Sequence, residues 1–255
     1  MRKSLTTHWS GTLATLAPLS VRRQVAMGKM ENQSVLQAVL FDFDFTLADP
    51  SAGTVECVNY ALTSLGWPEA SPQQIRETIG LSPVGTLQFL TGETNPAAAT
   101  EFGRLFRDRA DHIMVPRAVV YDTVRPTLAA LRAFRLSLGI VSTKRRRHIA
   151  GILARSQLLD HFDNIIGGED VATYKPDPEG LQLALSRLGV DPGVALYVGD
   201  HPVDSETAQR AGVRFVAVLS GTSTCDSFQG QPVLAFLNDL RELPSVLRGR
   251  GLVVS

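Results

Sequence analysis

Four groups of polar residues stand at or just after the ends of short apolar runs. They are Asp42, Asp44 and Thr46 in the first group, Ser142 in the second, Lys175 in the third, and Asp200 with Asp204 in the fourth. Carboxylates gathered in this number repel one another unless a hard dication lies among them, and Mg²⁺ prefers such oxygen ligands. If the runs are neighbouring strands, the sequence predicts a magnesium site formed by Asp42, Asp44, Asp200 and Asp204 that is suited to a phosphoryl group.

The residue types suggest the reaction. A carboxylate such as Asp42 can attack phosphorus and form an acyl phosphate, which divides one difficult hydrolysis into two easier steps. We expect Asp44 to protonate the leaving oxygen and then to activate water, provided that a turn after the strand brings it to the site. Lys175 and the Ser142 hydroxyl are expected to hold the nucleophile and the equatorial oxygens, over which charge spreads in the transition state.

The composition is that of an ordinary globular protein. The chain has 255 residues, 44% of them hydrophobic, which is enough for one substantial core and a smaller lobe. With 25 basic and 25 acidic residues, it lacks the charge excess typical of proteins that bind nucleic acid or anionic membranes. A small phosphorylated metabolite is the expected partner. The cysteines, Cys57 and Cys225, show no metal-ligand spacing, so we expect two small buried thiols in a reducing, cytoplasmic compartment.

The first 33 residues differ from the rest of the chain. They are rich in Ser, Thr and basic residues and contain no acidic residue before Glu31, a bias found in organelle transit peptides. We interpret residues 1–33 as a disordered extension, with organelle import as the alternative. The sequence makes no prediction of the oligomeric state.

Apolar runs alternate with helical patterns through most of the chain. Runs without strict polar alternation, typical of strands covered on both faces, occur at residues 35–41, 136–141, 164–166, 194–198 and 215–219. Helical patterns follow at residues 146–158, 179–188 and 205–211, the last two ending at glycines. This alternation predicts a doubly wound α/β fold, which binds ligands beyond the carboxyl ends of its strands.

The interval 50–121 breaks the alternation. Apolar spacing and cap-then-proline signals at Ser71, Ser82 and Asn95 predict four consecutive helices, the second ending at Gly80. We therefore divide the chain into an α/β core, residues 34–49 and 122–255, and an inserted helical cap, residues 50–121. One further amphipathic helix is expected at residues 233–240.

These motifs resemble those of haloacid dehalogenase superfamily phosphatases of the phosphoglycolate phosphatase type, which have a Rossmann-like core and a helical cap after the first motif. The resemblance covers about residues 36–221. It implies that Asp42 is the nucleophile, that Asp44 is the acid/base and lends its backbone carbonyl to Mg²⁺, and that Asp200 binds the metal. It also implies that Asp204 holds a metal-bound water and that Lys175 steadies the phosphoaspartyl group. Thr46, Ser142, Thr143 and Lys175 are the implied phosphate-binding residues.

Two departures from the family pattern concern the surroundings of the site. Many relatives have glycine where this chain has Phe45, so we expect a bulky ring at the mouth of the site. The second motif usually reads Thr-Asn-Lys, but here it is Ser142-Thr143-Lys144. The basic run that begins at Lys144 is interpreted as a solvated helix face, and His201 as a solvent-facing loop residue.

Other functions remain as alternatives. A pyrophosphatase or a phosphosugar mutase shares the same motifs, but mutases resembling this family carry Arg or Lys after the glycine at position 80, where this chain has Leu81. A phosphorylatable receiver-type switch also uses an acidic cluster with a hydroxyl and a lysine. It has no aspartate two positions beyond its acceptor and no four-helix cap, so a hydrolase is favoured.

Overall fold

The central feature of the molecule is one parallel sheet of six strands in the order β5-β4-β1-β6-β7-β8. The computed structural model describes residues 35–254, so the interpretation of residues 1–33 lies outside the described chain. The strands are β1 (Ala38–Phe41), β4 (Ser137–Val141), β5 (Asn164–Ile166), β6 (Ala195–Gly199), β7 (Arg214–Val218) and β8 (Ala235–Leu237). The doubly wound α/β prediction is confirmed.

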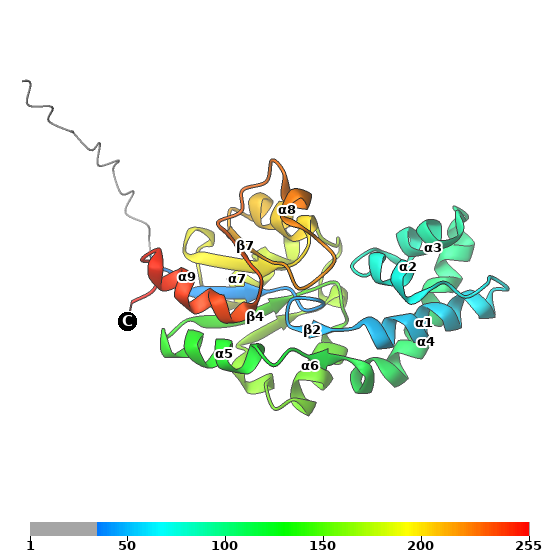
Figure 1. Ribbon diagram of the computed structural model, residues 1–255, viewed down its shortest axis with the longest axis horizontal. Coiled ribbons are helices and arrows are strands. Elements are labelled where there is room, and N and C mark those ends of the chain that lie inside the picture. The colour runs from blue at the N-terminus through cyan, green and yellow to red at the C-terminus, as the bar shows by residue number, and fades with distance from the viewer. Residues whose placement is uncertain (1–34, 255) are drawn as a thin grey trace, which may run out of the picture. The chain divides into compact units, whose positions relative to one another are not determined.

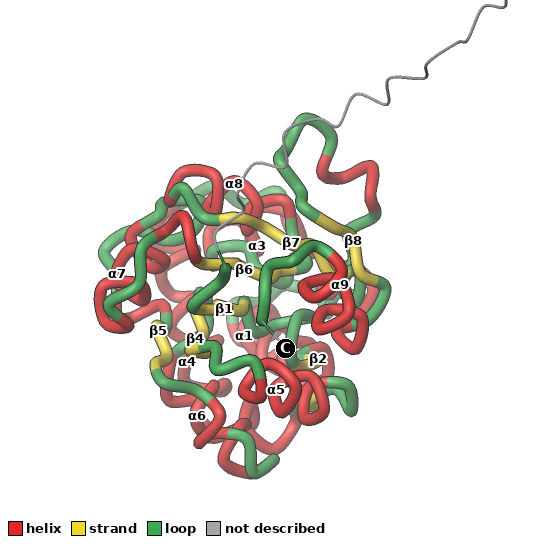
Figure 2. Tube along the Cα trace, turned by 90° about the vertical axis from the view of Figure 1, so that its left-hand side faces the viewer, coloured by secondary structure: helices red, strands yellow, loops and turns green. Residues whose placement is uncertain are grey.

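Helices cover both faces of this sheet (Figures 1 and 2). The helices on one face are α5 (Val124–Ala133), α6 (Arg146–Arg155) and α9 (Leu243–Gly249); those on the other are α7 (Glu179–Leu188) and α8 (Pro202–Ala211). Along β1, Val39 and Phe41 belong to the first core and Leu40 to the second, and all three are fully buried. Burial on both faces explains why these strands read as continuous apolar runs.

The register of the sheet places the polar groups together. β1 lies between β4 and β6, and its last residue, Phe41, is paired with Ile140 on one side and Val198 on the other. The strands are parallel, so the residues that follow their carboxyl ends emerge at the same edge. Asp42 and Asp200 leave adjacent strands there, with Ser142 on the other neighbour of β1.

Four helices follow the first strand, as predicted. We call this segment, residues 51–117, the cap; it consists of α1 (Ser51–Ser64), α2 (Pro72–Glu77), α3 (Pro83–Thr91) and α4 (Pro96–Arg117). The side chains of Ser71, Ser82 and Asn95 each accept a backbone N–H bond at the start of a helix, with proline as its first residue. The cap is flanked by a short antiparallel pair, β2 (Ala48–Asp49) and β3 (Val119–Val120). The exact domain limits remain a prediction.

The helix predicted at residues 233–240 is wrong. This segment contains β8, which pairs in parallel with β7 and buries Leu237 completely. A short apolar run fits a buried strand as well as a buried helix, and here pairing at the sheet edge decides the outcome. The C-terminal helix is α9, which was not predicted from the sequence. Leu243 and Leu247 anchor α9 in the same core as Phe41.

Several expected boundaries also shift. The first strand begins at Ala38, α2 ends at Glu77 three residues before Gly80, α6 ends at Arg155, and α8 begins at Pro202. Single-turn 3₁₀ helices lie at η1 (Leu159–His161), η2 (Gly168–Asp170), η3 (Pro192–Val194), η4 (Cys225–Phe228) and η5 (Leu240–Glu242). Cys57 is buried as expected, but Cys225 is exposed on η4, so that prediction is wrong. Among residues 35–254, no helix combines the length and the apolar character that crossing a bilayer requires.

One carboxylate links the cap to the core. Asp111, on α4, accepts hydrogen bonds from Arg147 and from His148 Nε2, both on α6, the latter at 2.9 Å. His148 is buried, and burial lowers the pKa of its imidazole, an effect that the hydrogen bond to Asp111 opposes. Burial therefore favours the neutral form of His148, and the link to Asp111 only partly offsets this effect.

We expect Leu247→Ala to destabilise the protein, because Leu247 is completely buried on α9. The free energy of unfolding should fall by about 2–5 kcal/mol, the usual cost of truncating a buried leucine. Urea unfolding measures this change, with exposed Ser245→Ala as the control. A loss equal to that of Ser245→Ala would show that α9 does not pack against the sheet.

The lowered pKa of His148 predicts a pH-dependent stability. Its ordinary value is 6.5, and the folded protein takes up this proton less readily than the unfolded chain. The free energy of unfolding should therefore fall as the pH drops from about 7.5 to about 5.5, and it should fall less in His148→Gln. Urea unfolding at both pH values measures the difference. Parallel losses in the two proteins would contradict the assignment.

Candidate active site

Three aspartates converge at the carboxyl edge of the sheet. One carboxylate oxygen from each of Asp42, Asp200 and Asp204 lies within 4.8 Å of the others, and all three residues are buried. Asp42 directly follows β1, Asp200 directly follows β6, and Asp204 lies in the first turn of α8. Among residues 35–254 this is the one cluster of acidic, histidine or cysteine side chains with the spacing of a metal site.

Local sequence features hold the aspartates in this position. His201 caps α8 through its imidazole, Pro202 begins the helix, and the Asp204 carboxylate accepts the backbone N–H of His201 at 3.2 Å. A methyl group at Gly221 would lie 2.0 Å from Asp200 Oδ2. Glycine is therefore needed at position 221 for the Asp200 carboxylate to occupy its place. His201 is exposed, as predicted, although its ring has this structural role.

Lys175 lies against two of the three carboxylates. Its Nζ atom is 2.9 Å from Asp42 Oδ1 and 2.5 Å from Asp204 Oδ1, and it donates a hydrogen bond to Tyr197. Burial by itself would lower the pKa of Lys175, but Asp204 and Asp42 outweigh it and raise the pKa well above its usual value. Lys175 is thus a fixed ammonium beside the expected nucleophile.

A single ammonium does not balance three buried carboxylates. Burial raises the pKa of Asp200 well above its ordinary range, and the neighbouring Asp204 and Asp42 raise it further. Asp42 Oδ1 is buried and makes no well-directed hydrogen bond, despite its ion pair with Lys175. An oxygen-rich, negatively charged cluster with an unsatisfied acceptor fits a hard dication such as Mg²⁺. Asp42, Asp200 and Asp204 are the residues that would hold it.

Asp44 lies beside this cluster rather than in it. A turn after β1, closed by hydrogen bonds from Phe45 N to Ala48 O and from Leu47 N to Phe43 O, brings Asp44 to the same cavity as Asp42. Its carboxylate does not belong to the three-aspartate group. Its expected contribution to the metal, a backbone carbonyl, stays a prediction.

Lys144 was wrongly interpreted as part of a solvated basic face. Its side chain is only 6% exposed, and its Nζ atom lies 3.0 Å from Asp44 Oδ2. Burial raises the pKa of Asp44, the nearby Lys144 cation opposes this change, and the Asp42 charge adds to it. The remaining oxygen, Asp44 Oδ1, is buried without a hydrogen-bond partner. Asp44 is thus a carboxyl group that holds a proton more tightly than an ordinary aspartate and that has one oxygen without a hydrogen-bond partner.

The predicted phosphate-binding residues are also brought together. Ser142 and Thr143 follow β4 and, with Lys175, line a cavity of about 30 Å³ that also contains Asp42, Asp44, Asp200 and Asp204. Thr46 is placed differently: its hydroxyl is fully buried and donates to Asp200 Oδ1 at 3.4 Å. In this structure Thr46 therefore contacts a metal-ligand candidate instead of lining the cavity.

Phe45 is less open than the sequence suggested. It is only 3% exposed, and the guanidinium of Arg76, from α2 of the cap, lies 4.4 Å from the centre of its ring. Its backbone φ is +58°, a left-handed conformation that costs a bulky residue energy and that glycine adopts freely. The glycine of many relatives at this position therefore matches the backbone, while Phe45 adds a contact between cap and core.

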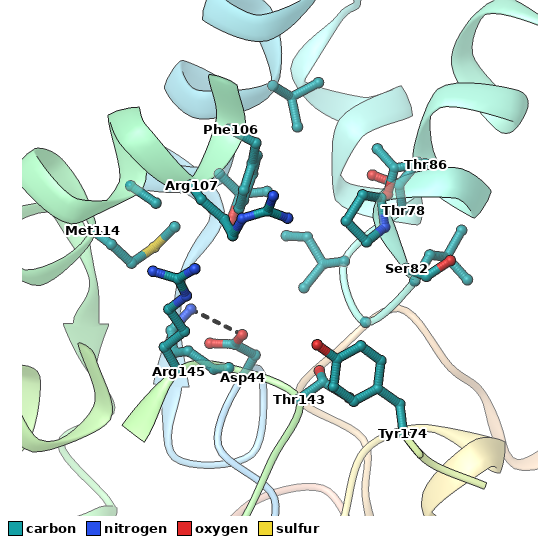
Figure 3. A pocket seen from close by; sticks show the side chains of 18 of the residues that line it. Asp44, Thr78, Ser82, Thr86, Phe106, Arg107, Met114, Thr143, Arg145 and Tyr174 are labelled. Atoms are coloured by element: carbon teal, nitrogen blue, oxygen red, sulfur yellow. Dashed lines mark hydrogen bonds and ion pairs between the residues drawn. The ribbon is translucent and has the colours of Figure 1, made fainter. Parts of the chain in front are cut away.

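A larger cavity continues from the site into the cap. Its volume is about 240 Å³, and residues of both the cap and the core line it, including Asp44, Thr143, Tyr174 and Arg107 (Figure 3). Arg107, Tyr174 and Tyr197 were not predicted as site residues. Arg107 lies mid-helix and Tyr197 mid-strand, where no motif marks them, whereas Tyr174 directly precedes Lys175.

Comparisons with known proteins agree with this geometry. A phosphoglycolate phosphatase of Salmonella typhimurium is 32% identical over 216 residues, covering 76% of this chain and 84% of that protein. One from Pseudomonas putida is 30% identical over 213 residues, covering 80% and 77%. A solved structure from Bacteroides fragilis, assigned to the haloacid dehalogenase-like hydrolases, is 39% identical with a TM-score of 0.78, covering 82% of this chain and 99% of that one.

The family model described as haloacid dehalogenase-like hydrolase matches residues 39–218. The match begins in β1, ends in β7, and includes the cap and all four groups of site residues. This chain belongs to the haloacid dehalogenase-like hydrolase family.

Proposed function

We propose that the protein is a Mg²⁺-dependent phosphatase that hydrolyses a small phosphorylated metabolite through a phosphoaspartyl intermediate on Asp42. The observation that carries this proposal is the buried group of Asp42, Asp200 and Asp204 with Lys175 against it. Curated relatives named phosphoglycolate phosphatase support the reaction class. When bound, Mg²⁺ would neutralise part of the charge of the carboxylates and of the incoming phosphate.

The residues divide the reaction into two steps. In the first, an Asp42 oxygen bonds to phosphorus while the bond to the leaving oxygen breaks, and Asp44 gives that oxygen a proton. The raised pKa of Asp44 suits this role. In the second, Asp44 takes a proton from water, which attacks the phosphoaspartyl group and frees Asp42. Lys175 holds Asp42 in place, and Ser142 and Thr143 donate to phosphoryl oxygens.

Hydrolysis is favoured over a mutase reaction. Ile79 and Gly80 of the cap line the small cavity with Asp42 and Asp44, so the cap loop closes directly over the expected nucleophile. Leu81 stands where mutases resembling this family have Arg or Lys and supplies no cation to hold a second phosphate. A pyrophosphatase remains the alternative, which a panel of phosphoglycolate, pyrophosphate and hexose phosphates tests by phosphate release.

Substitution of the two neighbouring aspartates tests the mechanism. With p-nitrophenyl phosphate and Mg²⁺, we expect Asp42→Asn to lower kcat by at least about 10³-fold, because an amide does not replace the nucleophile. Asp44→Asn should slow turnover and allow phosphoenzyme to accumulate, as detected by mass spectrometry of the acid-quenched protein. Asp160→Asn, an exposed carboxylate on η1, is the control and should keep the wild-type rate. A fully active Asp42→Asn enzyme would exclude Asp42 as the nucleophile.

A further inference from the structure

The cavity in the cap is placed to receive the part of the substrate that leaves with the ester oxygen. Asp44, the proposed acid, lies at its core end, and α4 of the cap forms the opposite wall (Figure 3). Its volume of about 240 Å³ is slightly below the roughly 300 Å³ at which clefts for drug-sized ligands begin. This space fits a small metabolite with more atoms than a two-carbon acid.

Arg107 is the cap arginine that has no carboxylate partner within the described residues. Arg76 pairs with Asp49, Arg104 with Glu101 and Asp108, and Arg109 and Arg117 both pair with Glu56. Arg107 has no such ion pair, although it is half-buried and lines the cavity. Figure 3 shows its guanidinium directed into the open space. An unpaired guanidinium in this position can form strong, charge-assisted hydrogen bonds with the carboxylate or phosphate of a ligand.

The other charges around the cavity leave it positive. Asp44 is the one carboxylate among its lining residues, and it is paired with Lys144. Arg145 also lines the cavity, and its ion pair with Asp111 is long, at 3.6 Å. Asp111 is shared with Arg147 and His148, which hold it more closely. Two guanidiniums, Arg107 and Arg145, are therefore available to a ligand.

Besides its charged residues, the cavity is lined by apolar side chains and by several serine and threonine hydroxyls. Ile79 lies on the cap loop, while Phe106 and Met114 belong to α4 on the same side as Arg107. Figure 3 places Asp44 on the floor and Arg107 on the far side, with empty space between them. A ligand that reaches both therefore needs a reactive ester at one end, an anion at the other, and carbon atoms in between.

We propose that the substrate is a phosphomonoester whose alcohol carries a second anionic group, separated from the ester oxygen by a short carbon spacer, and that Arg107 is the residue that selects it. This inference rests on the proposed phosphatase function and deepens it. Arg145 assists from the core side. The class differs from phosphoglycolate itself, in which a single carbon separates the carboxylate from the ester oxygen.

The test compares two esters that differ in one charge, the phosphate esters of 4-hydroxybutanoate and of its neutral amide. In wild-type enzyme with Mg²⁺, kcat/KM should be about 10- to 150-fold higher for the carboxylate, the value of one hydrogen bond to a charged group. The carboxylate ester should also be a better substrate than phosphoglycolate. Arg107→Met should reduce the ratio to about one third of the wild-type value or less, and Arg107→Lys should restore part of it.

Arg104→Met is the matched control, because Arg104 lies on the same helix but is exposed and paired with Glu101 and Asp108. It should leave the ratio between the two esters unchanged. Equal hydrolysis of both esters by wild-type enzyme would contradict the claim that the enzyme selects an anionic alcohol. A preference for phosphoglycolate would contradict the claim that a longer spacer is required. An unchanged ratio in folded Arg107→Met would overturn the role of Arg107. If neither ester nor p-nitrophenyl phosphate is hydrolysed, the proposed function itself fails.

Discussion

Electrostatic repulsion among three buried aspartates is the constraint on which the rest of the site depends. Asp42 is more than 150 residues from Asp200 and Asp204 in the sequence, yet the three carboxylates share a space less than 5 Å across. Buried like charges are costly unless they are paired, and Lys175 compensates only part of this charge. The folded core offsets the rest of this electrostatic cost. The apolar strands next to these residues are packed on both faces, and this packing holds the carboxylates together.

The two parts of the molecule divide the work around this cluster. The sheet edge fixes the reacting groups through register and short connections, so their positions depend on the most buried part of the chain. The cap adds Ile79 and Gly80 over the small cavity, and it contacts the core through Arg76 on Phe45 and through Asp111. The core thus supplies the reacting groups, and the cap supplies most of the cavity wall that faces the leaving group.

Much of this arrangement was predictable from the sequence, because the strands are continuous apolar runs, and Asp42, Ser142 and Asp200 follow theirs directly. The convergence of Asp42 and Asp200 followed from that order, whereas Lys175 reaches the site from a longer connection after β5. The rest depends on contacts distant in sequence. Lys144 looks like one of four consecutive basic residues, and only its pairing with Asp44 sets it apart. Likewise, Arg107 differs from the other cap arginines because it has no carboxylate partner among the described residues. Residues 235–237 form a strand because they pair with β7.

Thermal unfolding of the full chain with and without Mg²⁺ tests the central claim most directly. If the dication relieves repulsion in the cluster, saturating Mg²⁺ should stabilise the wild-type protein by about 3 kcal/mol at 100 times its Kd. Asp200→Asn should unfold at a higher temperature than wild type without metal, because one buried charge is gone, and should gain much less from Mg²⁺. The account would be contradicted if Mg²⁺ did not change the unfolding temperature of the wild-type protein and if Asp200→Asn were less stable than wild type without Mg²⁺.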